Sequence, residues 1–411
     1  MKAILLRLKS PWIFTFLSTC VALSLFLNSG FVSVSIIIFT FYCFFDRTPR
    51  PLDQAKSIGL LLLLSLYLCY ALWAIFFADA NGLNDLTKKI PLLIIPLGFL
   101  IRNKRIEQSD IEKILLLFTI GCIICSFICY ATAISNVIRE HSFSINTIDR
   151  KYYFFSNILL TEASGIPPIY LSMYFNLSFI YILECSLIKS RFLKAIIACY
   201  LALFLILIAS KMGVITLLLL IILWFAFKIH NKRIFILMIV LAILTFSIGI
   251  YKLSFLKERF ILSTQFDYTW THGHLWNSTT HRLAIWACSV EAISRAPFFG
   301  YGTGNGQAAL EQVYSEKKFV WGLQETYNPH NEFFSTQLDL GIIGSILFLG
   351  ILCLWIPQAI RIKNIFFLSI LLITSSSFLI ESLLLRQKGI VFFSFFYSFF
   401  FMLNGRKTYE L

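Results

Sequence analysis

Twelve mostly apolar stretches follow one another along the 411-residue chain, and each is close to the roughly 20 residues that a helix needs to cross a bilayer. Hydrophobic residues make up 58% of the chain and charged residues 14%, about half the roughly 25% of soluble domains. These values exclude a soluble enzyme, a disordered chain and a secreted disulfide scaffold. We predict an all-α polytopic membrane protein with about twelve transmembrane helices, at approximately residues 11–28, 30–45, 58–78, 88–101, 111–137, 164–187, 192–209, 212–228, 233–252, 332–357, 362–384 and 388–404.

The distribution of charge predicts the orientation of these spans. With the N-terminus in the cytoplasm, the segments on that side hold 20 of the 35 Lys and Arg residues and 7 of the 21 Asp and Glu residues, a net charge of +13 against +1 outside. Because basic segments stay on the cytoplasmic side, we predict that both termini are cytoplasmic. The overall charge of +14 therefore needs no nucleic-acid partner. The first ten residues resemble the start of a signal peptide without a cleavage site, and we interpret them as leading into an uncleaved first span.

A long polar stretch at about residues 253–331 interrupts the apolar pattern. We predict that it is a periplasmic loop between the ninth and tenth spans, inserted into a single membrane domain of residues 1–411, and that it carries part of a functional site. Within it, "HRLAIWACSVEAI" at 281–293 has apolar residues at helical spacing. This pattern predicts an amphipathic helix against the membrane surface or the helix bundle. Its apolar positions are Leu283, Trp286, Val290 and Ile293.

Four glycines follow this helix in "APFFGYGTGNG" at residues 296–306. Glycine adopts left-handed backbone conformations without a steric penalty, so the segment predicts a tight turn. The alternative is a turn whose amides contact an anion, and we favour the structural turn. The four positions are Gly300, Gly302, Gly304 and Gly306.

The tenth span begins within "NPHNEFFSTQLDLGIIGSILFLGIL". Asn328 as cap and Pro329 at the first helical position predict the helix start, which puts His330 in the first turn at the outer membrane edge. At about 100° per residue, Gly341 and Gly344 lie on the face of His330 and let another helix approach. A helix N-terminus disfavours imidazolium, so we expect a neutral His330 suited to general-base catalysis. The alternative is an interfacial histidine that caps the helix.

This pattern resembles the signature of the O-antigen ligase and polymerase superfamily of membrane glycosyltransferases, in which "HN" and "GIIG" stand nine residues apart. The block that begins at Arg282 is also similar, with a Trp four residues later, a Pro and a Gly-x-Gly turn. The predicted twelve spans, with the large loop between the ninth and tenth, fit the family as well. The structural members of the motif are Asn331, Gly341, Gly344, Gly302 and Gly304.

The resemblance implies a metal-independent enzyme without a cofactor that takes a glycan from undecaprenyl pyrophosphate. A ligase transfers it to a hydroxyl group of the lipid A core at the periplasmic face of the bacterial inner membrane, and we favour this activity. The alternative is an O-antigen or exopolysaccharide polymerase, which uses a lipid-linked acceptor. A polytopic transporter or flippase is a remote alternative, because the predicted spans are almost free of charged residues.

By resemblance, His330 would accept the proton of the acceptor hydroxyl, and Arg282 would bind the donor pyrophosphate and stabilise the leaving group. The family usually has a second Arg after the seventh span, where this chain has Lys211 in "ASKMG". Lys211 keeps the charge but lacks the planar guanidinium that binds phosphate through two hydrogen bonds. Direct attack by the acceptor implies inversion at the anomeric carbon.

Other charged residues are weaker candidates. Glu381 and Arg386 flank the last outer turn, as charged residues do in relatives, and would either line the acceptor cleft or pair with each other. Asp339 falls about 180° from His330 on the helix, which favours a structural contact. Glu325 and Glu332 flank His330 in the sequence and would be able to orient it.

Two further clusters favour structural roles. A basic and aromatic cluster in the outer loop before the sixth span favours an interfacial anchor over a phosphate or sugar site. Three histidines of the large loop lack the Cys or clustered acids of a metal site, so we predict none. These residues are Arg150, Lys151, Tyr152 and Tyr153, and His272, His274 and His281.

Overall fold

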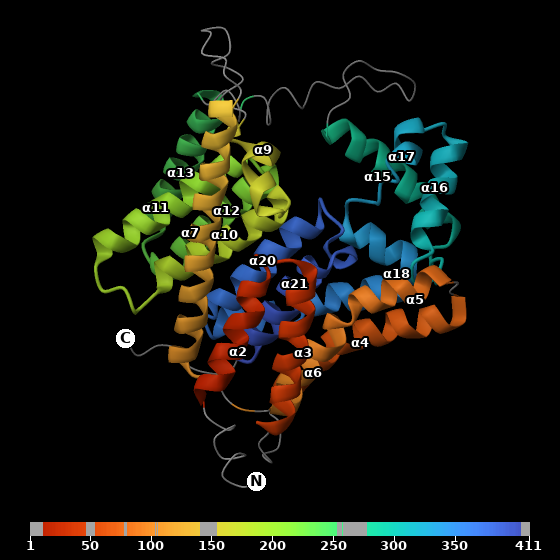
Figure 1. Ribbon diagram of the computed structural model, residues 1–411, viewed down its shortest axis with the longest axis horizontal. Helices are drawn as coiled ribbons and strands as arrows, with labels where there is room; N and C mark the ends of the chain where they lie inside the picture. Colours follow the sequence, from red (N-terminus) through yellow and green to blue (C-terminus); the bar gives the residue numbers. More distant parts are fainter. Residues whose placement is uncertain are drawn as a thin grey trace. The chain divides into compact units, whose positions relative to one another are not determined.

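The computed structural model describes residues 11–46, 54–77, 80–102, 104, 106–139, 154–252, 257 and 278–403. Over these residues helices are the only regular secondary structure (Figure 1), which confirms the all-α prediction. The chain forms two compact units, and each unit combines segments that are distant in the sequence.

The first unit contains the described parts of Met1–Ser35, Ile106–Leu262 and Ile365–Thr374. Its central helix is α10 (Pro168–Glu184), whose side chains from Tyr170 to Ile182 are all buried. A helix that is apolar on every side belongs in the interior. It packs against α7 (Gln108–Arg139), α11 (Arg191–Ile208) and α12 (Lys211–Lys228). The first unit also contains α2 (Pro11–Ser24), α9 (Asn157–Thr161), the 3-10 helix η2 (Glu162–Ser164) and α13 (Lys232–Lys252).

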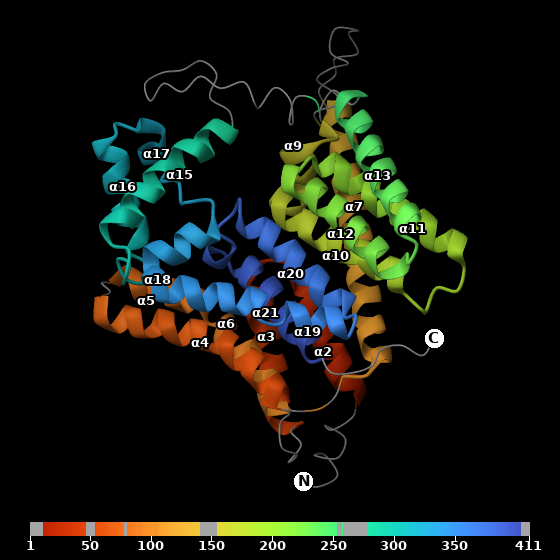
Figure 2. The ribbon, with the colours of Figure 1, turned by 180° about the vertical axis from the view of Figure 1, so that it is seen from behind.

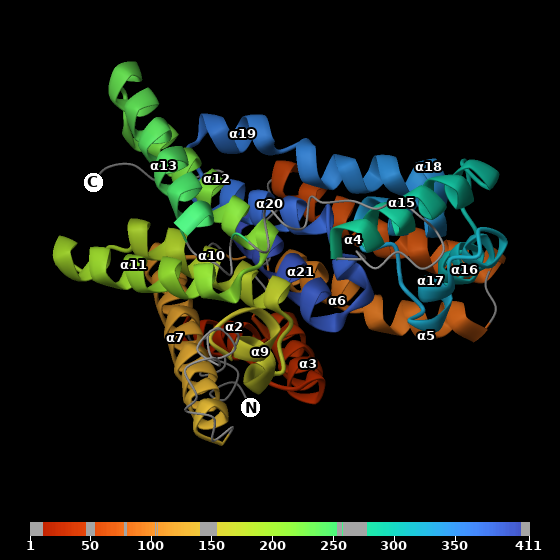
Figure 3. The same ribbon diagram turned by 90° about the horizontal axis from the view of Figure 1, so that it is seen from above.

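The second unit contains the described parts of Ile36–Arg105, Ser263–Asn364 and Ser375–Leu411. Its central helix is α21 (Gln387–Phe401), which is buried from Gly389 to Phe401. It packs against α4 (Gln54–Phe77) and α6 (Pro91–Arg102), and α4 in turn packs against α18 (Glu332–Cys353; Figure 3). The unit also holds α5 (Ala80–Lys89), α15 (Ser278–Arg295), α16 (Gly306–Glu316), α17 (Val320–Gln324), α19 (Ile356–Arg361) and η4 (Leu383–Leu385). Helices α3 (Ser29–Phe45) and α20 (Ile365–Phe378) contribute to both units.

Each of the twelve predicted spans contains a helix, but only six described helices are long and apolar enough to cross a membrane. A seventh is counted if α9 with η2 and α10, which meet at 80°, form one bent span. Helices α2, α3 and α20 are apolar but shorter. The fourth predicted span, 88–101, holds only the end of α5 and the 12-residue α6, which contains Pro96. The chain is thus a multi-pass membrane protein, and the number twelve stays a prediction.

The start of α18 differs from the sequence prediction. Asn331 is its N-cap, and its side-chain oxygen accepts hydrogen bonds from the amides of Phe333 and Phe334 at 2.9 and 3.2 Å. Asn328 is therefore not the cap, and Pro329 and His330 precede the helix. The prediction was wrong because Asn331 offers the same capping chemistry three residues later.

Helix α18 is also interrupted at Gly341, which has φ +65° and ψ −160°. At this break the amides of Tyr301 and Gly302 donate to the carbonyl oxygens of Leu338 and Asp339, at 2.7 and 3.1 Å. The glycine-rich turn thus hydrogen-bonds to the carbonyl groups of α18 next to the break. The predicted common face of His330, Gly341 and Gly344 was wrong, because it assumed one regular helix from residue 329.

The helix predicted at 281–293 is α15, which packs against α16 and α18 (Figure 2). Its buried face differs from the predicted one, because Val290 is 55% exposed. Small side chains allow the close packing on the other face, while Trp286 and Ile293 are partly buried beside it. The buried residues of this face are Ala284, Ile285, Cys288 and Ala292.

Candidate functional site

His330 lies in a strained segment between α17 and α18. Its φ is +45°, a left-handed conformation that costs a residue other than glycine about 1 kcal/mol. The side-chain oxygen of Asn328 accepts a hydrogen bond from the His330 amide at 2.8 Å, and Asn331 begins α18 directly after it. The conformation is therefore held from both sides. Strain of this kind is concentrated at functional sites.

The imidazole of His330 pairs with Glu381. Its Nδ1 atom lies 3.2 Å from Oε2 of Glu381, and the two side chains are 25% and 11% exposed. Asn331 ties down the segment around Glu381, because its Nδ2 donates to the carbonyl of Leu379 at 3.2 Å and its amide donates to Oγ of Ser382 at 3.3 Å. The motif residue Asn331 thus caps α18 and also aligns the His330–Glu381 pair.

The structure gives Glu381 a different contact from the pairing with Arg386 that the sequence suggested as one alternative. Among the described ion pairs its partner is His330, whereas Arg386 is exposed at the N-cap of α21. Glu332, the other acid expected near His330, is only 1% exposed, and its Oε2 accepts a hydrogen bond from the amide of Leu384 at 2.7 Å. Glu325 is exposed after α17. Glu381 is therefore the acid that contacts the histidine.

Arg282 lies in the first part of α15, where it is half-buried. The preceding residue, His281, is linked to the His330 segment through an aromatic ring. Its imidazole lies 5.6 Å from the ring of Tyr327, and the Tyr327 ring lies 6.0 Å from that of His330. Burial lowers the pKa of His281 below its ordinary value of 6.5. The two candidates are thus on neighbouring segments of one unit.

The glycines of the turn have a structural role, because the backbone there adopts left-handed conformations and packs closely against other segments. Gly302 and Gly304 have φ of +95° and +82°, and a Cβ on Gly302 would lie 2.6 Å from Cβ of Phe77. The Gly306 amide donates to Oδ1 of Asp339 at 3.3 Å, which gives Asp339 the structural contact that the sequence favoured. The amides of this segment are thus engaged within the protein, which supports the structural turn over an anion site.

Lys211 lies in the first unit, at the first position of α12. Ser210 is the N-cap, and its hydroxyl accepts a hydrogen bond from the amide of Gly213 at 3.3 Å. The side-chain amide of Asn176 donates to the Gly213 carbonyl at 3.0 Å. Lys211 is half-buried, so a well-anchored helix start holds the predicted phosphate-binding lysine.

A buried ion pair in α5 was missed by the sequence reasoning. Lys89 is 1% exposed, forms an ion pair with Asp85, and lies 4.6 Å from the ring centre of Tyr70. Burial alone would lower the pKa of Lys89, but the carboxyl groups of Asp85, Asp339 and Glu332 raise it above its ordinary value. The i, i+4 spacing of Asp85 and Lys89 was the available signal.

Several predictions lie outside the described residues, namely those for Arg150, Lys151, Tyr152, Tyr153, His272 and His274. Within the described ranges, no group of three His, Cys, Asp or Glu side chains is arranged to hold a metal ion.

Comparison with known proteins agrees with the resemblance. A family model described as O-antigen ligase matches residues 196–349, which include α15 and most of α18. The chain is 32% identical over 93 residues to a protein of Rickettsia conorii named "putative polysaccharide ligase", and 31% identical over 91 residues to one of Rickettsia felis with that name. Each match covers 21% of this chain and 22% of the relative. These findings support a ligase-type glycosyltransferase.

Proposed function

We propose that this chain transfers a glycan from undecaprenyl pyrophosphate to a hydroxyl group of the lipid A core, because residues 196–349 match a family model described as O-antigen ligase. The enzyme needs neither a metal ion nor a cofactor for this reaction. The His330–Glu381 pair at 3.2 Å is the observation that carries the proposal, because it combines a base with an acid that orients it. The residues from Arg282 to Gly344 that define the motif lie within the matched range.

His330 is the general base. Its Nδ1–H donates to the carboxylate of Glu381, which leaves the lone pair of Nε2 for the acceptor hydroxyl. As Nε2 takes the proton, the acceptor oxygen bonds to the anomeric carbon of the donor sugar. The bond from that carbon to the pyrophosphate oxygen breaks, and its electron pair leaves with undecaprenyl pyrophosphate. One direct displacement inverts the anomeric configuration.

By resemblance to the family, Arg282 of the second unit and Lys211 of the first are the cations that we assign to the donor pyrophosphate. Negative charge develops on the leaving oxygen during the displacement, and fixed cations stabilise it most strongly in a site with little water. Arg282 supplies a planar guanidinium for two hydrogen bonds, and Lys211 supplies a point charge. A pyrophosphate is already a good leaving group, so no strong acid is needed.

The proposed site faces the periplasm from the bacterial inner membrane, and both termini are cytoplasmic. In this topology the segment at 253–331 is a periplasmic loop that brings part of the active site to a single membrane domain. The charge asymmetry of the sequence, +13 inside and +1 outside, supports this orientation. The partners are the lipid-linked donor, the glycan acceptor and the bilayer.

Reconstitution tests the proposal. The purified chain in liposomes receives an undecaprenyl-pyrophosphate-linked O-antigen and lipid A core, and transfer is followed on gels. We expect the wild type to join the two and His330→Ala to slow transfer about 10²–10⁴-fold. His230→Ala, at an exposed histidine after α12, is the matched control and should be fully active. A fully active His330→Ala enzyme contradicts the base role.

The same assay separates the alternatives. Product that grows only on a second lipid-linked unit identifies a polymerase. Movement of the lipid-linked glycan between leaflets without any joining identifies a flippase. Either result would overturn the ligase assignment.

A further inference from the structure

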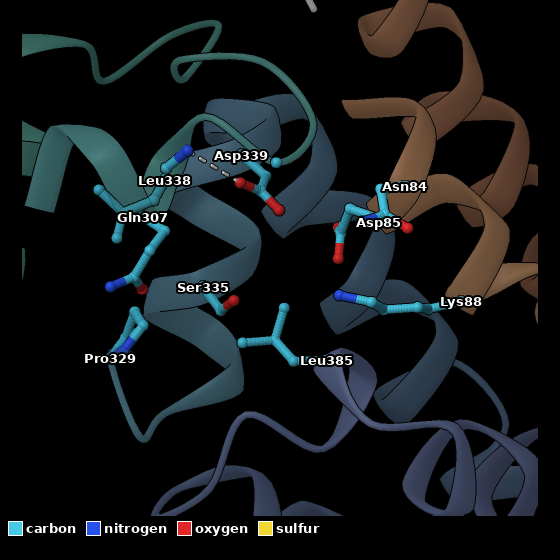
Figure 4. A pocket seen from close by; sticks show the side chains of 11 residues that line it. Asn84, Asp85, Lys88, Gln307, Pro329, Ser335, Leu338, Asp339 and Leu385 are labelled. Carbon is cyan, nitrogen blue, oxygen red and sulfur yellow. Dashed lines mark hydrogen bonds between the residues drawn. The ribbon is translucent and has the colours of Figure 1, made fainter. Parts of the chain in front are cut away.

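A polar pocket of about 260 Å³ opens within the second unit, next to the His330 segment (Figure 4). Side chains of α5 line one side, and those of α16 and α18 line the other. This volume is below the roughly 300–1,000 Å³ of sites for drug-sized ligands. It suits one sugar ring better than an oligosaccharide. Its lining includes Asn84, Asp85, Lys88, Gln307, Ser335 and Asp339.

The lining has the chemistry of a carbohydrate site. Asp85 and Asp339, which are 7% and 5% exposed, bring to the lining carboxyl oxygens, the atoms that accept hydrogen bonds from the hydroxyl groups of a sugar. The amide of Gln307 and the hydroxyl of Ser335 donate and accept. Pro329, Leu338 and Leu385 add apolar surface for the C–H groups of a ring.

The charged groups around the pocket give no positive excess. Asp85 is paired with the buried Lys89 behind it, Asp339 and Lys88 lie in the lining, and the carboxyl group of the buried Glu332 also acts on Lys89. Two lysines against three carboxyl groups do not attract a phosphate, and the pairing of Asp85 with Lys89 reduces the attraction for an ammonium group. The pocket therefore favours an uncharged polyhydroxylated ligand.

The position of the pocket indicates that the bound sugar belongs to the acceptor and not to the donor. Pro329 lines it, and the next residue is the proposed base His330. A base acts only within hydrogen-bond reach of the hydroxyl that it deprotonates. A ring in this pocket thus lies against the chain segment that carries His330.

We propose that this pocket binds a neutral sugar ring of the acceptor and presents its hydroxyl to His330. The assignment of the sugar to the acceptor rests on the proposed function, whereas the binding of a neutral sugar rests on the pocket alone. Asp339 and Ser335, both on α18, are the residues that select it.

Kinetics in the reconstituted system test the acceptor role. Asp339→Asn and Ser335→Ala should each raise KM for the acceptor about tenfold, the effect of one lost hydrogen bond of about 1.4 kcal/mol. KM for the donor should stay unchanged. Asp110→Asn is the matched control, since this buried acid of α7 lies outside the pocket and accepts a hydrogen bond from Thr15 at 2.8 Å. An unchanged acceptor KM, or a raised donor KM, overturns the proposal.

A binding measurement that needs no transfer separates the two proposals. Saturation-transfer NMR on the detergent-solubilised chain uses methyl glycosides of glucose, galactose and N-acetylglucosamine, with glucose 6-phosphate and glucosamine as charged probes. We expect a signal from at least one neutral glycoside that is lost in the Asp339→Asn/Ser335→Ala double variant and kept in Asp110→Asn. Binding without any transfer would refute the ligase and support the pocket. No neutral binding, or preference for a charged probe, would refute the pocket even if transfer is observed.

Discussion

The Nδ1 atom of His330 lies 3.2 Å from Oε2 of Glu381, although the two residues are 51 positions apart in the chain. Asn331 holds the two residues together. It caps α18 directly after His330, and it hydrogen-bonds to Leu379 and Ser382, which lie before and after Glu381 in the chain. One asparagine thus links the start of α18 to the turn before α21. His330 and Asn331, the "HN" pair of the motif, thus act together: Asn331 fixes the segment that Glu381 belongs to, and His330 contacts Glu381.

Glu381→Gln should lower kcat about 10–100-fold and leave both KM values unchanged, because the amide no longer provides a charged acceptor for Nδ1–H of His330. The effect should be smaller than that of His330→Ala, which removes the base itself. Glu316→Gln, at an exposed glutamate paired with Arg295, is the control and should retain full activity. If Glu381→Gln is as active as the wild type, Glu381 does not orient the base.

Arg282→Ala should abolish transfer, and Arg282→Lys should recover little, since a lysine ammonium cannot form the paired hydrogen bonds of a guanidinium. The measurement is the transfer rate at saturating acceptor, with KM for the lipid-linked donor. The control is Arg361→Lys, at an exposed residue in the last turn of α19. Unchanged donor KM and rate in both Arg282 variants would remove this residue from the mechanism.

Lys211→Arg should retain or increase activity, because arginine keeps the charge and adds the bidentate contact with phosphate. Lys211→Ala should raise KM for the donor. The thermal stability of both variants in detergent is measured beside the rate, since Lys211 follows the N-cap Ser210. A Lys211→Ala protein with normal donor kinetics would show that this lysine does not bind the pyrophosphate.

Gly341→Ala should destabilise the second unit by at least ~2 kcal/mol, from a left-handed backbone and overpacking together. The φ is +65°, and a new Cβ would lie 2.2 Å from the carbonyl oxygen of Phe298. Gly350→Ala is the matched control in the same helix, where the nearest atom lies 3.6 Å away, on Leu354. Melting temperatures in detergent measure both, and equal values would contradict the role of the break at Gly341.

Lys89→Met should destabilise the protein by about 3–5 kcal/mol, because Asp85 is left buried without its charge partner. The double variant Lys89→Met/Asp85→Asn should cost less than the sum of the single changes. Lys317→Met, which breaks an exposed pair with Glu291, should leave the melting temperature almost unchanged. Additive single changes would mean that Lys89 and Asp85 do not stabilise each other.

The pH dependence of the Lys89 effect has a definite sign. The folded-state pKa of Lys89 lies above its ordinary value of 10.5, because nearby carboxylates outweigh the burial that alone would lower it. The stabilisation is therefore fully present below that ordinary value and is lost as pH rises through the folded value. The difference in melting temperature between wild type and Lys89→Met should therefore fall as pH rises above 10.5. A difference that grows with pH in this range would contradict the assignment.

The sequence by itself determined the features that depend on local patterns. Apolar stretches of helical length identified a multi-pass helical protein, and the spacing within 281–293 located α15. The motif around His330 and Arg282 predicted a similarity to the O-antigen ligase family, whose model matches residues 196–349. Such features are readable because hydrophobic periodicity and short motifs are properties of neighbouring residues.

Only the tertiary structure decided how α18 begins and breaks and which acid contacts His330. Asn328 and Asn331 are equally good caps in the sequence, and contacts with the turn at 379–382 favour Asn331. The break at Gly341 forms because residues 297–302 hydrogen-bond into it. These outcomes depend on contacts between residues 37 to 51 positions apart in the chain. Such contacts override local propensity when they satisfy buried polar groups.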